Sequence, residues 1–155
     1  MDGRSSEAPQ HRTRTRHRSK SRGAGVNAPL IAAGCLAVVG AGIHGVAGEL
    51  LVVRKLSPAM LPPSRLGSPR MTRTMIHATW HIATIAFLTV GCGLVLAGSV
   101  LHGDTARGIA VLAAAAASGF AAVVLAFGAS PRSLLRHPGP AVLTATAALA
   151  WWGAL

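Results

Sequence analysis

The chain has 155 residues, of which 51% are hydrophobic and 12% charged, and only four residues are acidic. A soluble globular domain of this composition would lack the polar surface that it needs, so we interpret the sequence by the rules of the lipid bilayer. The formal net charge of +11 does not by itself indicate nucleic-acid binding. The basic residues gather in the N-terminal tail and in loops beside apolar segments, where membrane proteins carry their topology charges.

The first 28 residues differ in composition from the rest of the chain. Residues 1–28 are rich in Arg, Ser, Thr, Gly and Pro and cannot bury enough apolar surface to offset the entropy of ordering. We therefore predict a disordered basic tail. The tail has no Phe, Trp or Tyr on which a base could stack, so no nucleic-acid partner is expected. Whether this segment belongs to the native protein is left open by the sequence.

Four apolar runs follow the tail and predict four transmembrane helices. They cover residues 29–53, 76–101, 108–128 and 140–155. A helix of about 20 residues crosses the hydrocarbon core of a bilayer, and the last run, with Trp151 and Trp152 as an interfacial anchor, is close to the shortest length that can. The predicted fold is an all-α bundle of four transmembrane helices formed by residues 29–155, packed through small residues. Basic residues are nearly balanced between the two sides, so the orientation stays open.

The ionisable residues of the predicted bundle gather towards one membrane face. His44 and Glu49 lie late in the first helix, and His77, Trp80 and His81 lie early in the second. His77 and His81 share a helix face by the i, i+4 rule, whereas His44 and Glu49 are separated by about 140° around their helix. We therefore predict a polar cluster or ligand site at His44, Glu49, Trp80 and His81, with His77 as a secondary member.

The chemistry of this cluster has three interpretations. The histidines could fix the register of the first two helices as neutral hydrogen-bonding groups. His44 and His81 could instead ligate a metal or a b-type haem, because haem iron accepts His ligands and helix bundles house haem. Glu49 with a histidine could also form a proton or substrate pathway, because ionisable groups inside a membrane usually have a partner or a function. No cofactor is predicted firmly, and haem b is the one that the pattern allows.

The remaining motifs favour no enzyme class. The cysteines, Cys35 and Cys92, stand alone in apolar runs, so no zinc knuckle or haem-attachment motif is present. Hydrolase, metalloprotease and nucleotide-binding motifs are also absent from the sequence. We expect an integral membrane protein, leaning away from an enzyme. The rival functions are b-haem electron transfer, proton-coupled transport and an accessory role in a membrane complex, as a homodimer or in a larger assembly.

Three stretches resemble small four-helix membrane proteins of actinobacteria and other bacteria. They are the residues from His44 to Leu50, the triplet Thr79, Trp80 and His81, and the run Arg136, His137 and Pro138 followed by Trp151, Trp152 and Gly153. The resemblance covers residues 30 to 155 and leaves out the tail. It implies the four-helix fold and a multi-pass protein of a bacterial cytoplasmic (inner) membrane, and it implies no activity.

Overall fold

The computed structural model describes residues 25–61, 67–127 and 138–155. The predicted disordered tail, apart from residues 25–28, lies outside this range, and so do Arg136 and His137. The described part is helical, with four α-helices: α1 (Ala28–Leu51), α2 (Pro69–Ser99), α3 (Gly103–Phe127) and α5 (Pro138–Ala154). Two 3-10 turns, η1 (Val53–Lys55) and η2 (Pro58–Met60), follow α1. Helices α1, α2 and α3 are long and apolar enough to cross a membrane, which confirms the all-α prediction and three of its apolar spans.

The second helix is longer than its apolar run. It begins at Pro69, not near residue 76, because Ser68 caps it by accepting a hydrogen bond from the Met71 amide at 3.4 Å. Proline in the first turn suits the start of a helix, since its missing N–H would have no intrahelical partner. Hydropathy predicts only the apolar part of α2, whereas the capping residues set where the helix begins.

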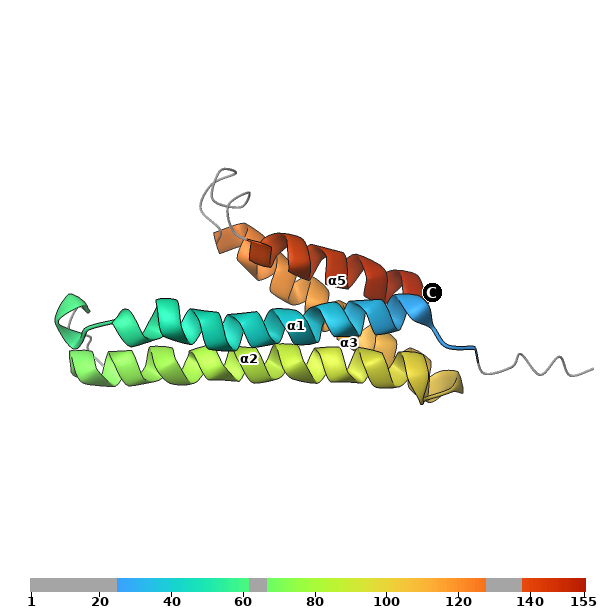
Figure 1. The fold of residues 1–155 in the computed structure, drawn as a ribbon, viewed down its shortest axis with the longest axis horizontal. Coiled ribbons are helices and arrows are strands. Elements are labelled where there is room, and N and C mark those ends of the chain that lie inside the picture. Colours follow the sequence, from blue (N-terminus) through green and yellow to red (C-terminus); the bar gives the residue numbers. More distant parts are fainter. Residues whose placement is uncertain (1–24, 62–66, 128–137) are drawn as a thin grey trace, which may run out of the picture.

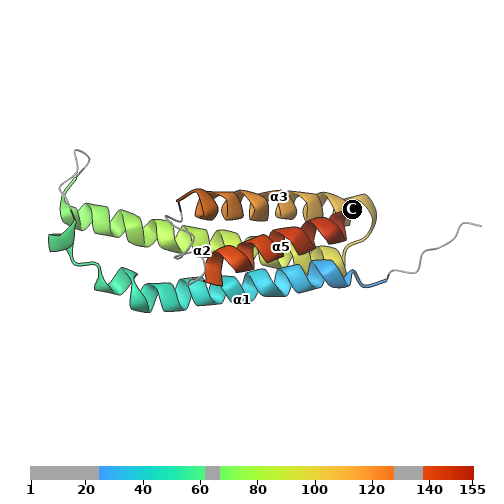
Figure 2. The same cartoon turned by 90° about the horizontal axis from the view of Figure 1, so that it is seen from above.

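Figures 1 and 2 show that α1 and α2 lie side by side along most of their length. Helices α3 and α5 cover only the part of this pair that includes the start of α1 and the end of α2, where the C-terminus of the chain also lies. The end of α1 and the start of α2 therefore project beyond the four-helix region. The first residues of α2 and the last residues of α1 come together on this projecting part.

Asn27 ties three helix ends together at the opposite end of the molecule. Its side chain caps α1 by accepting from the Leu30 amide at 3.3 Å, and its Nδ2 donates to the Gly153 carbonyl at 2.8 Å. Its backbone N–H donates to the carbonyl of Gly98, near the end of α2, at 2.9 Å. The start of α1 and the ends of α2 and α5 consequently share one end of the bundle.

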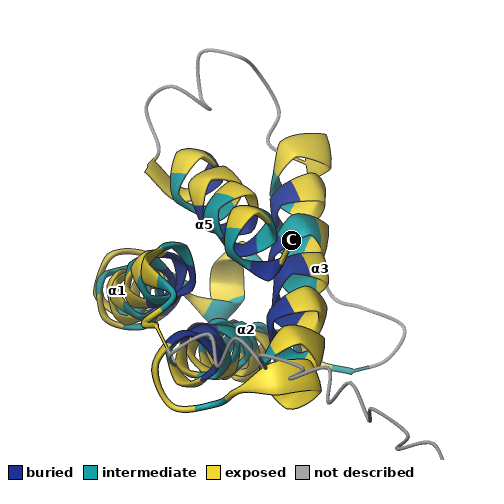
Figure 3. Cartoon of the chain, turned by 90° about the vertical axis from the view of Figure 1, so that its right-hand side faces the viewer, coloured by how far each residue is buried: buried dark blue, intermediate teal, exposed yellow. Residues whose placement is uncertain are grey.

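The buried core consists mainly of small residues, as the sequence predicted. Alanines on the facing sides of the helices are buried, among them Ala33, Ala41, Ala114, Ala117 and Ala150. Larger side chains point outward: Ile43, Ile82 and Leu112 are 58%, 65% and 72% exposed. Figure 3 shows the buried residues on the inner sides of the helices and the exposed ones around them. This distribution suits a lipid surrounding, where close backbone packing stabilises helix contacts and large apolar side chains need not be hidden.

Candidate functional site

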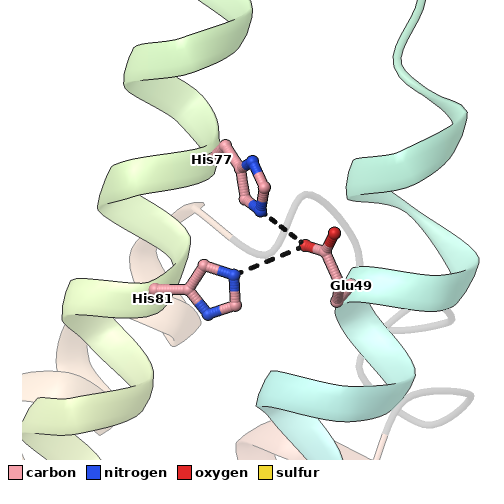
Figure 4. A group of neighbouring side chains, drawn as sticks. All are labelled: Glu49, His77 and His81. Carbon is pink, nitrogen blue, oxygen red and sulfur yellow. Dashed lines mark ion pairs between the residues drawn. The ribbon is translucent and has the colours of Figure 1, made fainter.

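A cluster of two imidazoles and one carboxylate lies on the projecting part of the α1–α2 pair. We call Glu49, His77 and His81 the His–Glu cluster. Oε2 of Glu49 lies 3.1 Å from Nε2 of His77 and 3.6 Å from Nε2 of His81. Figure 4 shows the two histidines on successive turns of α2, both directed towards the carboxylate on α1. One ligand atom from each residue lies within 4.8 Å of the other two.

The carboxylate of this cluster is largely buried, and one of its oxygens lacks a hydrogen bond. The Glu49 side chain is only 16% exposed, and its Oε2 atom is inaccessible and has no hydrogen-bond partner among the described residues. The imidazole nitrogens are therefore close to Oε2 without being aligned to donate to it. Buried acceptors without a donor are rare in proteins, and an ionised one is costly.

Two arginine side chains make supporting contacts near the cluster. Nε of Arg54 lies 3.4 Å from Oε1 of Glu49, so it contacts the carboxylate oxygen that faces away from His77. Arg73, one turn before His77, donates from its Nε to the Leu56 carbonyl at 2.8 Å. The second contact fastens the connection after α1 to α2. Together they hold Glu49 opposite the histidines.

His44 lies apart from the His–Glu cluster in an aromatic stack. Its ring is parallel to that of Trp80, with centroids 4.2 Å apart and an interplanar angle of 7°. The Phe87 ring meets the His44 ring edge-on, with their centroids 5.3 Å apart. The Trp80 indole N–H donates to the His44 carbonyl at 3.1 Å, and Gly48 leaves room for the indole, since a Cβ there would collide with it. Trp80 thus packs between α1 and α2.

The predicted site residues accordingly separate into two groups. Glu49 and His81 come together, and His77, predicted as a secondary member, makes the shortest contact with the carboxylate. His44 and Trp80 form the other group. The i, i+4 spacing of His77 and His81 already indicated that both lie on one face of α2. The separation of about 140° between His44 and Glu49 indicated that these two residues face different sides of α1.

The His–Glu cluster has the ligand types of a transition-metal site. Zinc binds imidazole nitrogen and carboxylate oxygen at about 2.0 to 2.1 Å in tetrahedral geometry, which places neighbouring ligand atoms about 3.3 Å apart. The two nitrogen-to-oxygen distances of 3.1 and 3.6 Å bracket that value. Three protein ligands also leave one coordination position open, as in zinc sites that bind water or a substrate.

Comparisons with protein-family models, curated proteins and solved structures find no match for this chain.

Proposed function

We propose that this chain is an integral membrane protein that binds a divalent transition metal, zinc in the first instance, at Glu49, His77 and His81. The observation that carries the proposal is the buried Oε2 of Glu49, which has two imidazole nitrogens 3.1 and 3.6 Å away and no hydrogen-bond donor in the described part of the chain. A cation bound between the three ligands would satisfy this oxygen. Arg54 on Oε1 would act as a supporting contact that orients the ligating carboxylate.

The proposed site lies at a boundary between membrane and water. A hydrocarbon core of about 30 Å is crossed by about 20 helical residues. Twenty residues counted forward from the start of α1 reach Ala47. Twenty residues counted back from the end of α2 reach Trp80. Glu49 lies just beyond this length in α1, and in α2 His81 and His77 lie on either side of its limit. This depth gives a metal access from the aqueous side.

The proposal includes four membrane spans, with α5 as the last, in a bacterial cytoplasmic membrane. Helix α5 has 17 residues, or about 25 Å, which is slightly shorter than the hydrocarbon core. Two features support it as a span. It packs against α1 and α3, and its end meets the start of α1 through the bond between Asn27 and Gly153. Four spans place both chain ends on one side, so reporter fusions at the two ends should report the same compartment. Opposite compartments would contradict four spans.

Zinc titration of the purified protein tests the metal site. After chelator treatment in detergent, the wild-type chain should bind one zinc ion per chain. Glu49→Gln and the double variant His77→Ala/His81→Ala should each weaken binding at least about tenfold, because removal of a ligand or of a supporting contact typically costs 10- to 100-fold in affinity. His102→Ala is the matched control, since His102 is an exposed histidine near the other end of α2.

Two results would contradict the proposed metal site. One is a wild-type protein that binds no zinc at micromolar concentration. The other is a double variant that binds zinc as the wild type does while His102→Ala weakens binding, which would place the metal elsewhere.

A further inference from the structure

The two cysteines of the chain lie at the same depth in neighbouring helices. Cys35 is seven residues past Ala28 at the start of α1, and Cys92 is seven residues before Ser99 at the end of α2. Because these two helix ends share one end of the bundle, each cysteine lies about 10 Å inside it at the helical rise. Both are free and exposed, and the sequence contains no other cysteine.

Each cysteine directly follows a glycine at which α1 and α2 meet through their backbones. A Cβ added at Gly34 would lie 2.6 Å from the Gly91 carbonyl oxygen, and one added at Gly91 would lie 3.0 Å from the Gly34 carbonyl oxygen. The two glycines therefore face each other at one level. Because glycine has no side chain to separate the helices, the two backbones approach closely there.

Helix geometry turns both cysteines to the same flank of this contact. Successive helical residues are rotated by about 100°, and in an antiparallel pair the residues that follow two facing positions turn to the same side. Burial agrees with this rotation. Ala33 and Val90, the residues directly before the two glycines, pack in one core cluster, whereas the cysteines, directly after them, are exposed. The cysteines therefore face outward together.

The other end of the contact between α1 and α2 shows that residues in these positions reach each other. Gly48 faces Trp80 there, and the residues that follow them, Glu49 and His81, meet with Oε2 and Nε2 3.6 Å apart. The cysteines hold the same positions beside a glycine–glycine contact, so their shorter side chains also meet. A disulfide requires Cα atoms about 4.4 to 6.8 Å apart, which such close backbones allow.

The surroundings of the two thiols decide which chemistry suits them. Val39, Leu88 and Leu96 each lie four residues from one of the cysteines, on the same helix face, and all three are exposed. In a membrane this flank lies against hydrocarbon. Thiolates that bind a metal would place charge there, which is costly, whereas a pair of thiols and a disulfide are both uncharged. A reactant that comes through the lipid is itself lipid-soluble.

We propose that Cys35 and Cys92 form a reversible two-electron redox pair that reacts with a lipid-soluble quinone. On oxidation the two S–H bonds break and one S–S bond forms between α1 and α2. The two electrons and two protons pass to the quinone, whose two carbonyl oxygens become the hydroxyls of a hydroquinone. One quinone is consumed per chain, and a hydroquinone or an added dithiol reverses the reaction.

Oxidation by decylubiquinone tests the pair in the full chain. All ring carbons of this quinone are substituted, so a thiol does not add to the ring. The protein is treated with chelator, reduced, placed in lipid nanodiscs and incubated with the quinone without oxygen. Both wild-type thiols should become unreactive towards a maleimide while the protein stays a monomer, with one hydroquinone formed per chain. Dithiothreitol should restore both thiols.

Three variants separate an internal disulfide from other thiol reactions. Cys35→Ser and Cys92→Ser each keep one thiol, which should stay reactive towards the maleimide and yield no hydroquinone. The double variant Cys92→Ser/Leu96→Cys is the matched control, because it keeps two exposed cysteines but moves one by about a helical turn. Its oxidation should be at least about tenfold slower, since the Cα atoms then lie beyond disulfide range. Glu49→Gln should react as the wild type does, so the result is independent of the metal site.

Three results would overturn the inference. The first is a wild-type protein that keeps both thiols in excess quinone, and the second is a disulfide that joins two chains instead of one. The third is a displaced pair, in Cys92→Ser/Leu96→Cys, that oxidises as fast as the natural pair.

Discussion

A close backbone approach between α1 and α2, at Gly34, provides a direct test of the fold. A Cβ added at Gly34 would lie 2.6 Å from the Gly91 carbonyl oxygen and 2.8 Å from the Val95 backbone nitrogen. These contacts are shorter than real Cβ atoms show, and both atoms belong to the α2 backbone. The Gly34→Ala variant can therefore be accommodated only if the two helices move apart.

The expected effect follows from two opposing contributions. Forcing one methyl group into a packed core costs about 1 to 3 kcal/mol, and a contact with backbone belongs at the upper end of that range. Alanine is the better helix former, which returns about 1 kcal/mol. Gly34→Ala should then lower the free energy of unfolding by about 2 kcal/mol.

Gly42→Ala is the matched control on the same helix. A Cβ at Gly42 would meet no atom of the described residues within 4 Å, so this variant should gain about 1 kcal/mol from helix propensity alone. The two variants should differ by about 3 kcal/mol, or roughly 100-fold in the folding equilibrium. Unfolding in mixed micelles, followed by tryptophan fluorescence and circular dichroism, measures both. Equal stabilities would refute the packing of Gly34 against Gly91.

Further predictions concern single contacts and the metal. Trp80→Phe keeps the ring stacked on His44 and loses the indole donor, so it should lower the free energy of unfolding by about 1 kcal/mol; an unchanged value would mean that this bond adds nothing. Asn27→Ala loses both the α1 cap and the bond to Gly153 and should cost about 1 to 2 kcal/mol, while Asn27→Asp, which keeps a capping oxygen, should lose less. Zinc at 100 times its dissociation constant should stabilise the wild type by about 2.7 kcal/mol. Zinc affinity should be lower in acid than at neutral pH, because protons compete with the metal for its ligands; a pH-independent affinity would point to other ligands. The reduced visible spectrum tests haem binding: we expect no Soret band, and a band lost in both His44→Ala and His81→Ala would replace the zinc proposal.

Much of the fold could be predicted from the sequence because its physical signals are local. The apolar runs identified the helices, and their boundaries agree with α1 and α5 to within about two residues. The largest difference is at α2, where Ser68 and Pro69 start the helix in a polar segment. Capping depends on a few side-chain contacts with the backbone, to which hydropathy is insensitive.

The candidate site could be predicted only in part. Helical periodicity placed His77 and His81 on one face of α2 and separated His44 from Glu49 around α1. Periodicity within one helix does not say how neighbouring helices are rotated against each other. That rotation brings Glu49 to the two histidines and turns His44 towards Trp80.

The sequence by itself determined the kind of molecule: helical segments that are long and apolar, with small residues for packing and a few ionisable groups near one end. These properties follow from composition and spacing along the chain. Only the tertiary structure decided which polar atoms meet a partner. Among the residues that the structure describes, Oε2 of Glu49 and Oγ1 of Thr146 have no hydrogen-bond partner. Such contacts between distant segments are not encoded in any local pattern.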